Sequence, residues 1–498
     1  MQKRLTFLFI AICIAKFLIA QPLATQLKEF DTYIEKSRKE WQVPGMAVAV
    51  VKDGKVIFKK GYGVSQLGTT NVVDIQTIFA CASTTKAMTA ACMGILVDEG
   101  KVKWDDAVIK HLPEFHVYDP YVTRELKIRD LFTHTSGVGN ADFLWGVMNV
   151  SSDVVLKKMI EVEPSYSLRS SFIYQNIFYL TAGKVIEKVS GQKWADFIQA
   201  KIFQPLGMKR TFPTLAAAKD ANHSKPHYLV NGSIKTIEPT YADEIGPAGS
   251  VNASIEDMAK WMVCMLDSSK YERGRLLKKS TWVELFKPQV IVPASQFYPT
   301  MQLIKPNWMT YGLGWFQHDY KGKKINYHTG SLAGEVAIHA QMPDSKLGIY
   351  VFANYDHAEV RHALVYKAFD LFALGGNRDW SAEFLKLYQG IKAKSDQVEK
   401  DFEAKRMSNT NPSRSLEEYA GKYTSPLYGE LEITLADKKL LFNTNNFLKA
   451  TLTHWHYDTF HGMYDKDWYG NALASFSLNA TGKIEKVNFE GKEFVKKQ

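Results

Sequence analysis

The chain has 498 residues, of which 46% are hydrophobic and 23% charged, and its formal net charge at pH 7 is +10. This is an ordinary globular composition, long enough for two or three hydrophobic cores. The basic excess has no accompanying cluster of basic and aromatic residues, so the sequence predicts no nucleic-acid partner.

The first twenty residues predict a signal peptide that is removed on export. Lys3 and Arg4 give a positive start, residues 5–15 form a mostly apolar run, and Ala20 precedes a plausible cleavage point. Lys16 interrupts the apolar run, whereas a membrane span needs ~20 apolar residues, so we expect no stable membrane insertion. Cleavage removes three basic residues and no acidic one, which lowers the net charge from +10 to +7. We therefore expect an exported protein, periplasmic or extracellular.

Three cysteines remain after this cleavage, Cys81, Cys92 and Cys264. An odd and sparse set of cysteines is not a disulfide framework. Cys81 lies two residues before Ser83, and we expect it to be buried and reduced.

The first part of the chain predicts a helix, a hairpin and a second helix. The helical pattern covers residues 25–42. The hairpin strands are residues 46–51 and 56–62, which flank a two-residue Asp-Gly turn signal. The second helix is expected to open at Ser83 and to end near Gly100, because glycine is a natural helix stop.

Ser83 and Lys86 open this second helix as an S-x-x-K motif. Residues three apart on a helix share one face. A serine hydroxyl is a weak nucleophile until a base takes its proton, and a lysine can be that base when burial destabilises its ammonium form. Alone, the motif also fits a capped helix with a solvated lysine.

The middle of the chain, roughly residues 104–300, is loop-rich and helical in places. One clear helix covers residues 177–191. Tyr174, Gln175 and Asn176 stand directly before it. A tyrosine near a lysine can take part in proton transfer, and an asparagine amide can orient both the lysine and a substrate carbonyl.

Strand patterns return near the end of this region, over residues 311–318, 324–329, 335–342 and 347–354. The second pattern ends in His328-Thr329-Gly330, where the glycine would let a substrate backbone approach the strand closely. A helical pattern follows over residues 359–374. Because the early hairpin and these strands can join one antiparallel sheet around an inserted helical region, we expect an α+β fold.

The order of these three motifs resembles that of the serine β-lactamase and penicillin-binding-protein superfamily, on its class C β-lactamase-like branch. Three further segments resemble the family, Pro44–Val51, Leu131–Gly137 and Gly246–Ser250. The resemblance covers roughly residues 26–380. It implies an antiparallel sheet flanked by helices, with the active site where the sheet meets an inserted helical lobe. The same branch contains D-aminopeptidases, DD-peptidases and carboxylesterases.

The resemblance also implies a serine hydrolase that forms an acyl-enzyme. Ser83 would attack a carbonyl, Lys86 and Tyr174 would relay its proton to the leaving group, and Asn176 would hold them in register. The order of proton transfer between the lysine and the tyrosine stays open.

The third motif is expected to supply the edge along which a substrate lies. The resemblance assigns the oxyanion to the backbone N–H groups of Ser83 and Ser331, next to Thr329 and Gly330. Losing one such donor typically costs about 10²–10³ in rate.

His328 is a departure from the family pattern. Most β-lactamases of the family have a lysine there, a fixed cation for the substrate carboxylate, whereas histidine is mostly neutral near pH 7. This weakens the case for efficient β-lactam hydrolysis, and histidine at this place is familiar in the aminopeptidase- and esterase-like members. We take His328 as a catalytic candidate, against the alternative of a strand histidine with satisfied hydrogen bonds.

Other candidates have simpler explanations. Glu335 could receive a substrate amine but is more simply a solvated loop carboxylate, and His134 is expected to be structural. His454 and His456 have a spacing that can bind metal. Since only His461 accompanies them, we predict an aromatic-rich strand surface there, no metal and no cofactor.

The C-terminal third changes character. Residues 381–412 are charged and helix-prone and predict a helical linker. The alternation over residues 413–498 predicts a small, barrel-like all-β module. It is similar to the lipocalin-like extension on some proteins of this branch. The expected organisation is a signal peptide over residues 1–20, a hydrolase domain over residues 25–380, the linker and this module.

The sequence as a whole predicts an exported serine hydrolase that cleaves an amide or ester bond through Ser83. Peptides or cell-wall fragments are the first substrate class, small esters the second, and β-lactams a side activity. The alternatives are a carboxylesterase of the same fold, or a penicillin-binding receptor or wall-binding protein without turnover. An intact set of Ser83, Lys86 and Tyr174 argues against a pure binder. The C-terminal module could bind a ligand or partner, cover the cleft or mediate oligomer contacts, and the sequence does not settle the oligomeric state.

Overall fold

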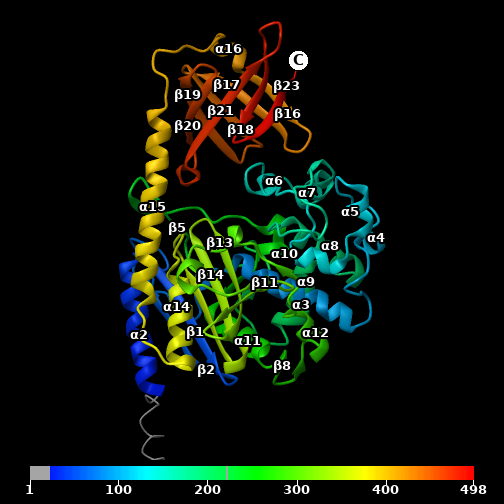
Figure 1. Cartoon of the computed structure of the whole chain (residues 1–498), viewed down its shortest axis with the longest axis vertical. Coiled ribbons are helices and arrows are strands. Elements are labelled where there is room, and N and C mark those ends of the chain that lie inside the picture. The colour runs from blue at the N-terminus through cyan, green and yellow to red at the C-terminus, as the bar shows by residue number, and fades with distance from the viewer. Residues whose placement is uncertain (1–22, 220–221, 498) are drawn as a thin grey trace, which may run out of the picture.

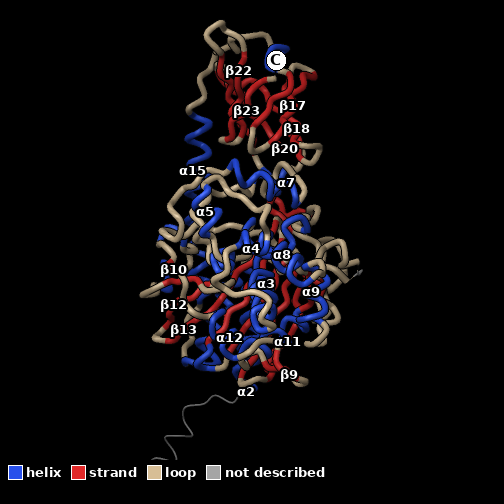
Figure 2. Tube along the Cα trace, turned by 90° about the vertical axis from the view of Figure 1, so that its right-hand side faces the viewer, coloured by secondary structure: helices blue, strands red, loops and turns tan. Residues whose placement is uncertain are grey.

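The structure is a computed structural model that describes residues 23–219 and 222–497 (Figure 1). The predicted signal peptide lies outside the described residues. The long helix α15 (Trp380–Ala404) runs beside a layered domain and up to a small barrel. Figure 2 shows the same arrangement from the side, with the barrel strands grouped at one end of the molecule.

One antiparallel sheet of eight strands organises the larger domain. In their order across the sheet, the strands are β10 (Val290–Ile291), β11 (Met309–Tyr311), β12 (Phe316–Tyr320), β13 (Lys323–Leu332), β14 (Glu335–Met342), β15 (Leu347–Ala353), β1 (Gly45–Lys52) and β2 (Lys55–Gly63). Strands from both ends of the domain's sequence therefore lie side by side in one sheet, where β1 pairs with β15. The expected α+β fold is confirmed.

The first hairpin forms as predicted. β1 and β2 pair in antiparallel register, and the turn residues Asp53 and Gly54 both have positive φ, 50° and 76°. Such a turn matches the twist of the two strands it joins. β1 is almost wholly buried because helices cover both faces of the sheet at this point.

The single strand predicted over residues 311–318 is wrong. β11 ends at Tyr311 and β12 begins at Phe316, and these two residues pair across a tight turn. Gly314 supplies its left-handed backbone, with φ of +83°. The alternating apolar pattern ran through the turn because Leu313 and Trp315 are themselves buried.

The sheet separates two hydrophobic cores. On one face lie α2 (Leu23–Glu40) and α14 (Val360–Phe369), packed against the side chains of Met46, Val48 and Val50. On the other face, Ala47, Ala49 and Val51 pack towards α11 (Ile255–Leu266) and a helical lobe. The even spacing within β1 sends alternate side chains to opposite cores.

The inserted lobe is mostly helical. Its helices are α3 (Thr85–Asp98), α4 (Val108–His111), α5 (Pro120–Glu125), α6 (Phe143–Gly146), α7 (Ser152–Lys157), α8 (Ile177–Ser190), α9 (Trp194–Ile198), α10 (Gly246–Gly249), α12 (Lys279–Leu285) and α13 (Met301–Ile304). Small β elements accompany them, namely β3 (Ile78–Ala80), β4 (Thr211–Phe212), β5 (His227–Val230), β6 (Ser233–Thr236), β7 (Asn252–Ser254), β8 (Lys270–Tyr271) and β9 (Gly274–Arg275). α8 begins and ends where the sequence predicts, with Gly191 as its left-handed cap.

The C-terminal module follows α16 (Leu416–Tyr419) and is a closed barrel of eight antiparallel strands. Its strands are β16 (Gly421–Ser425), β17 (Gly429–Ala436), β18 (Lys439–Thr444), β19 (Leu448–His456), β20 (Thr459–Tyr464), β21 (Asn471–Leu478), β22 (Ile484–Phe489) and β23 (Lys492–Lys496). Buried side chains form a third core here, which includes Tyr419, Tyr423, Phe442, Phe460, Phe476, Phe489 and Phe494. An eight-stranded barrel is just wide enough for its side chains to fill.

The helices over residues 23–219 and 222–497 include none with the combined length and apolar character needed to cross a bilayer.

The contact between α8 and α10 leaves no room for a side chain at Gly183. A Cβ there would lie 2.2 Å from Cγ of Pro247, whose ring cannot move aside. We predict that Gly183→Ala lowers the free energy of unfolding by about 1–3 kcal/mol, as overpacking usually does. Chemical denaturation measures this change.

A matched control is Gly390→Ala in the middle of α15, where an added Cβ meets nothing within 4 Å. Because alanine is the better helix former, this variant should gain up to about 1 kcal/mol. Equal changes in the two variants would contradict the packing argument.

Candidate active site

Ser83 lies in a 3-10 turn, Ala82–Thr84, directly before α3. The sequence predicted that Ser83 opens the α-helix. In the structure the turn comes first, and α3 begins at Thr85. Ala82 has a left-handed backbone with φ of 47°, which is strained for a residue other than glycine. The Thr84 hydroxyl lies 2.8 Å from the Cys81 carbonyl oxygen, to which it donates, and 2.6 Å from the hydroxyl of Tyr350. The turn is therefore held rigidly against the sheet.

Lys86 follows Ser83 by three residues, on the first turn of α3, and its side chain contacts Ser83. Its Nζ lies 3.0 Å from Ser83 Oγ, 2.7 Å from Asn176 Oδ1 and 2.9 Å from the carbonyl oxygen of Ala248. Two of these partners can only accept hydrogen bonds. In a neutral amine they take both hydrogens and leave the lone pair directed at the hydroxyl of Ser83.

The surroundings of Lys86 favour that neutral form. Burial lowers the pKa of Lys86 from 10.5 to about 7, and the charge of Asp142 opposes this shift. Nζ lies 4.9 Å from the ring centre of Tyr174 and 5.2 Å from that of Tyr179. A substantial fraction of the lysine is therefore able to accept a proton near neutral pH.

Tyr174 completes the group around Ser83. Its hydroxyl hydrogen-bonds the Ser83 side chain, and burial raises the pKa of Tyr174 well above 10, so it is a phenol at neutral pH. The ring of His134 stacks on that of Tyr174, with centres 4.3 Å apart. His134 Nδ1 accepts from the backbone N–H of Gln175, and burial lowers the pKa of His134 well below 6.5. His134 is thus a neutral support for Tyr174.

Asn176 links Lys86 to a carboxylate that sequence reasoning missed. Its Nδ2 donates to Asp142 Oδ2 at 2.8 Å, while Oδ1 faces Lys86. Asp142 Oδ1 accepts from Trp145 Nε1 at 2.9 Å. The side chain of Gln175 instead anchors the loop at residues 138–139, to whose carbonyl groups it donates.

Gly330 lets the nucleophile turn pack directly on β13. A Cβ at Gly330 would lie 2.2 Å from the Cys81 carbonyl oxygen and 3.0 Å from Ser83 N. The close neighbour in the structure is the protein's own backbone, and the approach of a substrate backbone along this strand stays a prediction. Arg361, buried on α14, donates to the Gly330 carbonyl oxygen at 2.5 Å and to Ser331 Oγ at 3.1 Å. Arg361 therefore fixes the part of β13 that faces Ser83 from the side of α14.

His328 lies near this group with both ring nitrogens engaged. Nδ1 donates to the Thr329 carbonyl oxygen at 2.6 Å, so Nε2 accepts from the Tyr311 hydroxyl at 2.9 Å. Burial lowers the pKa of His328 to about 3. This geometry matches the alternative of a strand histidine with satisfied hydrogen bonds. The hydroxyl of Thr329 contacts that of Tyr298 at 2.7 Å.

Glu335 is not the solvated carboxylate expected from the sequence. It begins β14 and is buried, its carboxyl accepts from the backbone N–H of Ala80, and Oε1 has no partner. Burial raises the pKa of Glu335 to about 8. It lines a cavity of about 10 Å³ with Asn252 and Leu332, which is the space of one water molecule. β14 is covered here by the lobe, an effect of tertiary packing that the local sequence does not show.

The remaining candidates lie away from Ser83. His454 Nε2 donates to the Tyr457 carbonyl oxygen, and His456 Nδ1 accepts from the Met407 N–H, so both belong to the junction of linker and barrel. The three cysteines at residues 81, 92 and 264 are free and buried. In the part of the chain that the structure describes, no three His, Cys, Asp or Glu side chains come together as metal ligands would.

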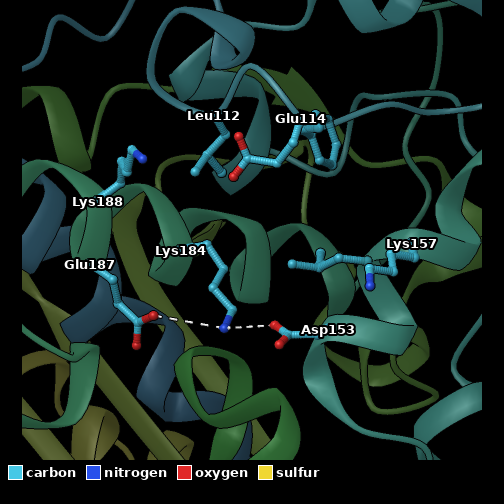
Figure 3. A pocket seen from close by; sticks show the side chains of 9 residues that line it. Leu112, Glu114, Asp153, Lys157, Lys184, Glu187 and Lys188 are labelled. Carbon is cyan, nitrogen blue, oxygen red and sulfur yellow. Dashed lines mark ion pairs between the residues drawn. The ribbon is translucent and has the colours of Figure 1, made fainter.

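A surface pocket of about 420 Å³ lies between α4, α7 and α8 (Figure 3). Leu112, Phe115 and Leu156 contribute its apolar lining. Lys184 bridges Asp153 at 3.2 Å and Glu187 at 3.8 Å. None of the pocket-lining residues contacts Ser83, so this pocket is separate from the candidate site.

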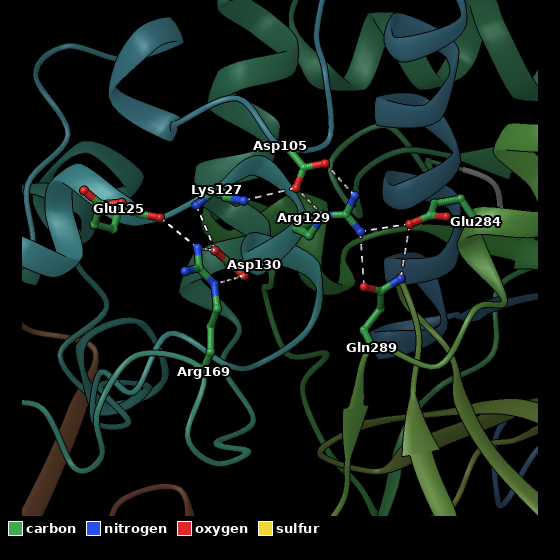
Figure 4. Close-up of polar contacts among 8 residues, drawn as sticks. All are labelled: Asp105, Glu125, Lys127, Arg129, Asp130, Arg169, Glu284 and Gln289. Carbon is green, nitrogen blue, oxygen red and sulfur yellow. Dashed lines mark hydrogen bonds and ion pairs between the residues drawn. The ribbon is translucent and has the colours of Figure 1, made fainter.

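A network of charged residues holds the loop that carries His134 (Figure 4). Arg169 donates to both carboxylate oxygens of the buried Asp130, and its backbone N–H donates to the Thr135 carbonyl oxygen at 2.7 Å. Arg129 joins the same region to α12 through Glu284 at 2.8 Å. Exposed ion pairs contribute little one by one, but loss of Arg169 would leave the buried carboxylate of Asp130 without its cationic partner, which is costly.

Sequence reasoning missed several groups of the site. They are Asp142, the carbonyl of Ala248, Tyr298, Tyr311 and Arg361. One of them, Ala248, lies in the Gly246–Ser250 segment that resembles the family, but the likeness gave it no role.

Two family models match the chain, and several known proteins are similar to it. The beta-lactamase family model matches residues 30–371, and a model for a domain of unknown function (DUF3471) matches residues 405–498. The unguisins hydrolase ungD of Aspergillus violaceofuscus is 27% identical over 446 residues, covering 83% of this chain and 77% of that protein. Protein flp of Staphylococcus aureus (strain MW2) is 26% identical over 337 residues, covering 66% of this chain and 63% of that protein.

Among solved structures, the octameric penicillin-binding protein homologue from Pyrococcus abyssi superposes with a TM-score of 0.61 at 20% identity. The superposition covers 94% of this chain and 99% of that chain. At this identity the likeness concerns the fold alone, and it extends over the sheet domain and the barrel.

The lowered pKa of Lys86 predicts the pH dependence of acylation. If neutral Lys86 is the base, the rate of labelling by a fluorophosphonate rises with pH and levels off above a midpoint near 7. Asp142→Asn removes the charge that stabilises the ammonium form, so its midpoint should be lower. Labelling rates measured by intact mass from pH 5 to 9 test both points, and a midpoint near 10.5 would exclude a buried base.

The close packing at Gly330 predicts a sharp effect of one methyl group. Gly330→Ala must displace the nucleophile turn from β13, and we expect the labelling rate of Ser83 to fall by at least about a hundredfold. Gly390→Ala in α15 is the control, because it also adds a methyl group but at a position where a Cβ meets nothing within 4 Å. Unaltered labelling of Gly330→Ala would show that the turn is mobile.

Proposed function

The chain belongs to the beta-lactamase family, and on this premise we propose that it is an exported serine hydrolase that cleaves an amide or ester bond through an acyl-enzyme on Ser83. The observation that carries the proposal is the meeting of three groups at one point. Ser83 Oγ, the Lys86 amine and the Tyr174 hydroxyl come together although Tyr174 is about ninety residues away in the chain.

Acylation begins when neutral Lys86 takes the proton of Ser83. Oγ then forms a bond to the carbonyl carbon of the substrate, and the carbonyl oxygen gains negative charge. The backbone N–H groups of Ser83 and Ser331 receive this oxyanion, and the close packing of the Ser83 backbone on β13 at Gly330, the residue before Ser331, supports their pairing. The bond to the leaving amine or alcohol breaks as that group gains a proton.

Tyr174 is the proposed donor of that proton. Because the pKa of Tyr174 lies well above 10, it holds its proton at neutral pH and is poorly suited to be the first base. It passes its proton to the leaving group and regains one from the Lys86 ammonium ion. The proposed order of transfer is therefore Ser83 to Lys86, and Lys86 through Tyr174 to the leaving group.

Deacylation reverses these roles with water. Lys86, neutral again, takes a proton from a water molecule that attacks the ester carbon. The bond from that carbon to Ser83 Oγ breaks, and Oγ recovers a proton from Lys86. The product leaves with a new carboxyl group.

Peptide amides and small esters are the proposed substrate classes, with peptides first. The family position that often carries a fixed cation is occupied by His328, which is neutral, buried and hydrogen-bonded on both nitrogens. A β-lactam carboxylate therefore lacks that partner, and β-lactams are at most a side activity. Two relatives whose names describe them as unguisins hydrolases support hydrolysis as the reaction type.

We also propose that the protein is exported and acts at the cell wall. The support is the positive start, apolar run and cleavage pattern of the first twenty residues, together with the moderate basic charge of the remaining chain. Cell-wall peptides are then the substrates within reach.

Ser83→Ala tests the proposal. The mature protein is incubated with a fluorophosphonate, a penicillin, p-nitrophenyl esters and D-amino-acid amides, and both intact mass and product release are followed. Wild type should form an adduct and release product from an amide or an ester, whereas Ser83→Ala should do neither.

The matched control is Ser280→Ala, at an exposed position of α12, which should behave like wild type. An adduct that persists without product would replace the enzyme with a receptor that lacks turnover. Activity in Ser83→Ala equal to wild type would remove Ser83 from the mechanism altogether.

A further inference from the structure

One irregular segment, residues 142–149, lies between the candidate site and the barrel. On the site side, Asp142 accepts from Asn176, which in turn accepts from Lys86. The only helix in the segment is α6, which has four residues. So short a helix cannot hold its own conformation, and its position depends on what packs around it.

The barrel binds this segment through the turn between β18 and β19. Asn445 Nδ2 donates to the carbonyl oxygens of Met148 at 3.2 Å and Asn149 at 3.4 Å. Thr444 Oγ1 donates to the Val147 carbonyl oxygen at 3.2 Å. Three consecutive carbonyl groups of the segment thus point at one barrel turn.

Two further barrel loops reach the same segment. The ring of Tyr428 packs edge-on against that of Phe143, with centres 5.2 Å apart. The Tyr469 hydroxyl donates to the Gly146 carbonyl oxygen at 3.4 Å. The barrel therefore contacts five of the seven residues from 143 to 149, and Asp142 is the residue directly before them.

We propose that the C-terminal barrel is a positioning element of the active site, which holds residues 142–149 so that Asp142 keeps Asn176 and Lys86 in place. The inference rests on the proposed function, because it gives the barrel a part in the reaction of Ser83. In this proposal, Asn445 and Tyr428 are the positioning residues.

The electrostatics of Lys86 give this arrangement a measurable signature. The groups that face its Nζ are the phenols Tyr174 and Tyr179 and the neutral histidines His134 and His328. Asp142 is the anion whose charge raises the pKa of Lys86 against the effect of burial. If Asp142 moves away, the pKa of Lys86 falls.

The barrel remains attached when these contacts are removed, because other contacts hold it. Phe402 of α15 stacks on Trp455, with ring centres 5.6 Å apart, and Lys235 pairs with Asp467 at 3.3 Å. A variant at the 142–149 contact therefore changes the segment without releasing the barrel.

The test uses the full chain with Tyr428→Ala and Asn445→Gly combined. Asn445 has φ of 51°, which glycine adopts without strain. We expect kcat to fall by roughly tenfold or more and the acid limb of kcat/KM to move down by about half a pH unit or more. Asn488→Ala, at an exposed site of β22 away from this contact, is the matched control and should equal wild type.

A second background separates positioning from a general loss of structure. In Asp142→Asn the anion is already absent, so adding Tyr428→Ala and Asn445→Gly should move the acid limb no further. Thermal unfolding verifies that the barrel is folded in each variant. The single Asn445→Gly variant should show a smaller shift of the acid limb in the same direction.

Two outcomes overturn the inference. If the double variant keeps the kcat and acid limb of wild type, or shifts the limb equally in the Asp142→Asn background, the barrel has no positioning role. Wild type that neither reacts with a fluorophosphonate nor turns over a substrate would overturn the proposed function itself, which is a different result.

Discussion

The contact between Lys86 and Ser83 is the constraint that the rest of the site depends on. A buried ammonium ion is costly, while a neutral amine needs only acceptors for its two hydrogens. Asn176 and the carbonyl of Ala248 are those acceptors, and they come from two different parts of the helical lobe. Placing one lysine therefore requires α3, the start of α8 and α10 to meet. The same requirement explains why Gly183 must leave room for Pro247.

The nucleophile turn packs directly on β13 because the facing residue of the strand is a glycine. Gly330 admits the backbone of Cys81 and Ser83, and Arg361 holds the carbonyl behind it. On the far side of the site, residues 142–149 connect the lobe to the barrel. The catalytic groups thus lie where the sheet meets the lobe, and the barrel reaches them through this segment.

Sequence patterns predicted what depends on local spacing. The hairpin at Asp53, the helix after Asn176, the alternation in the barrel and the S-x-x-K motif are all of this kind. Patterns failed where contacts between segments far apart in the chain decide a residue's surroundings. The carbonyl of Ala248 has no residue signature, Asp142 belongs to no motif, and Glu335 looks solvated until β14 is covered by the lobe. The fold class could be predicted because strands from both ends of the domain could pair, whereas the partners of Lys86 could not, because they are set by contacts between segments far apart in the chain.

The buried carboxyl of Glu335 and the buried amine of Lys86 together make the stability of the fold depend on pH. Between pH 4.5 and about 8, the folded chain holds a proton on Glu335 that the unfolded chain releases, so stability falls as pH rises. Between about 7 and 10.5, the unfolded chain holds a proton that Lys86 has lost, so stability rises. The contribution of this pair to stability is therefore smallest between about pH 7 and 8. That is the interval in which the lysine first becomes a competent base, so the chain gives up stability where it gains reactivity.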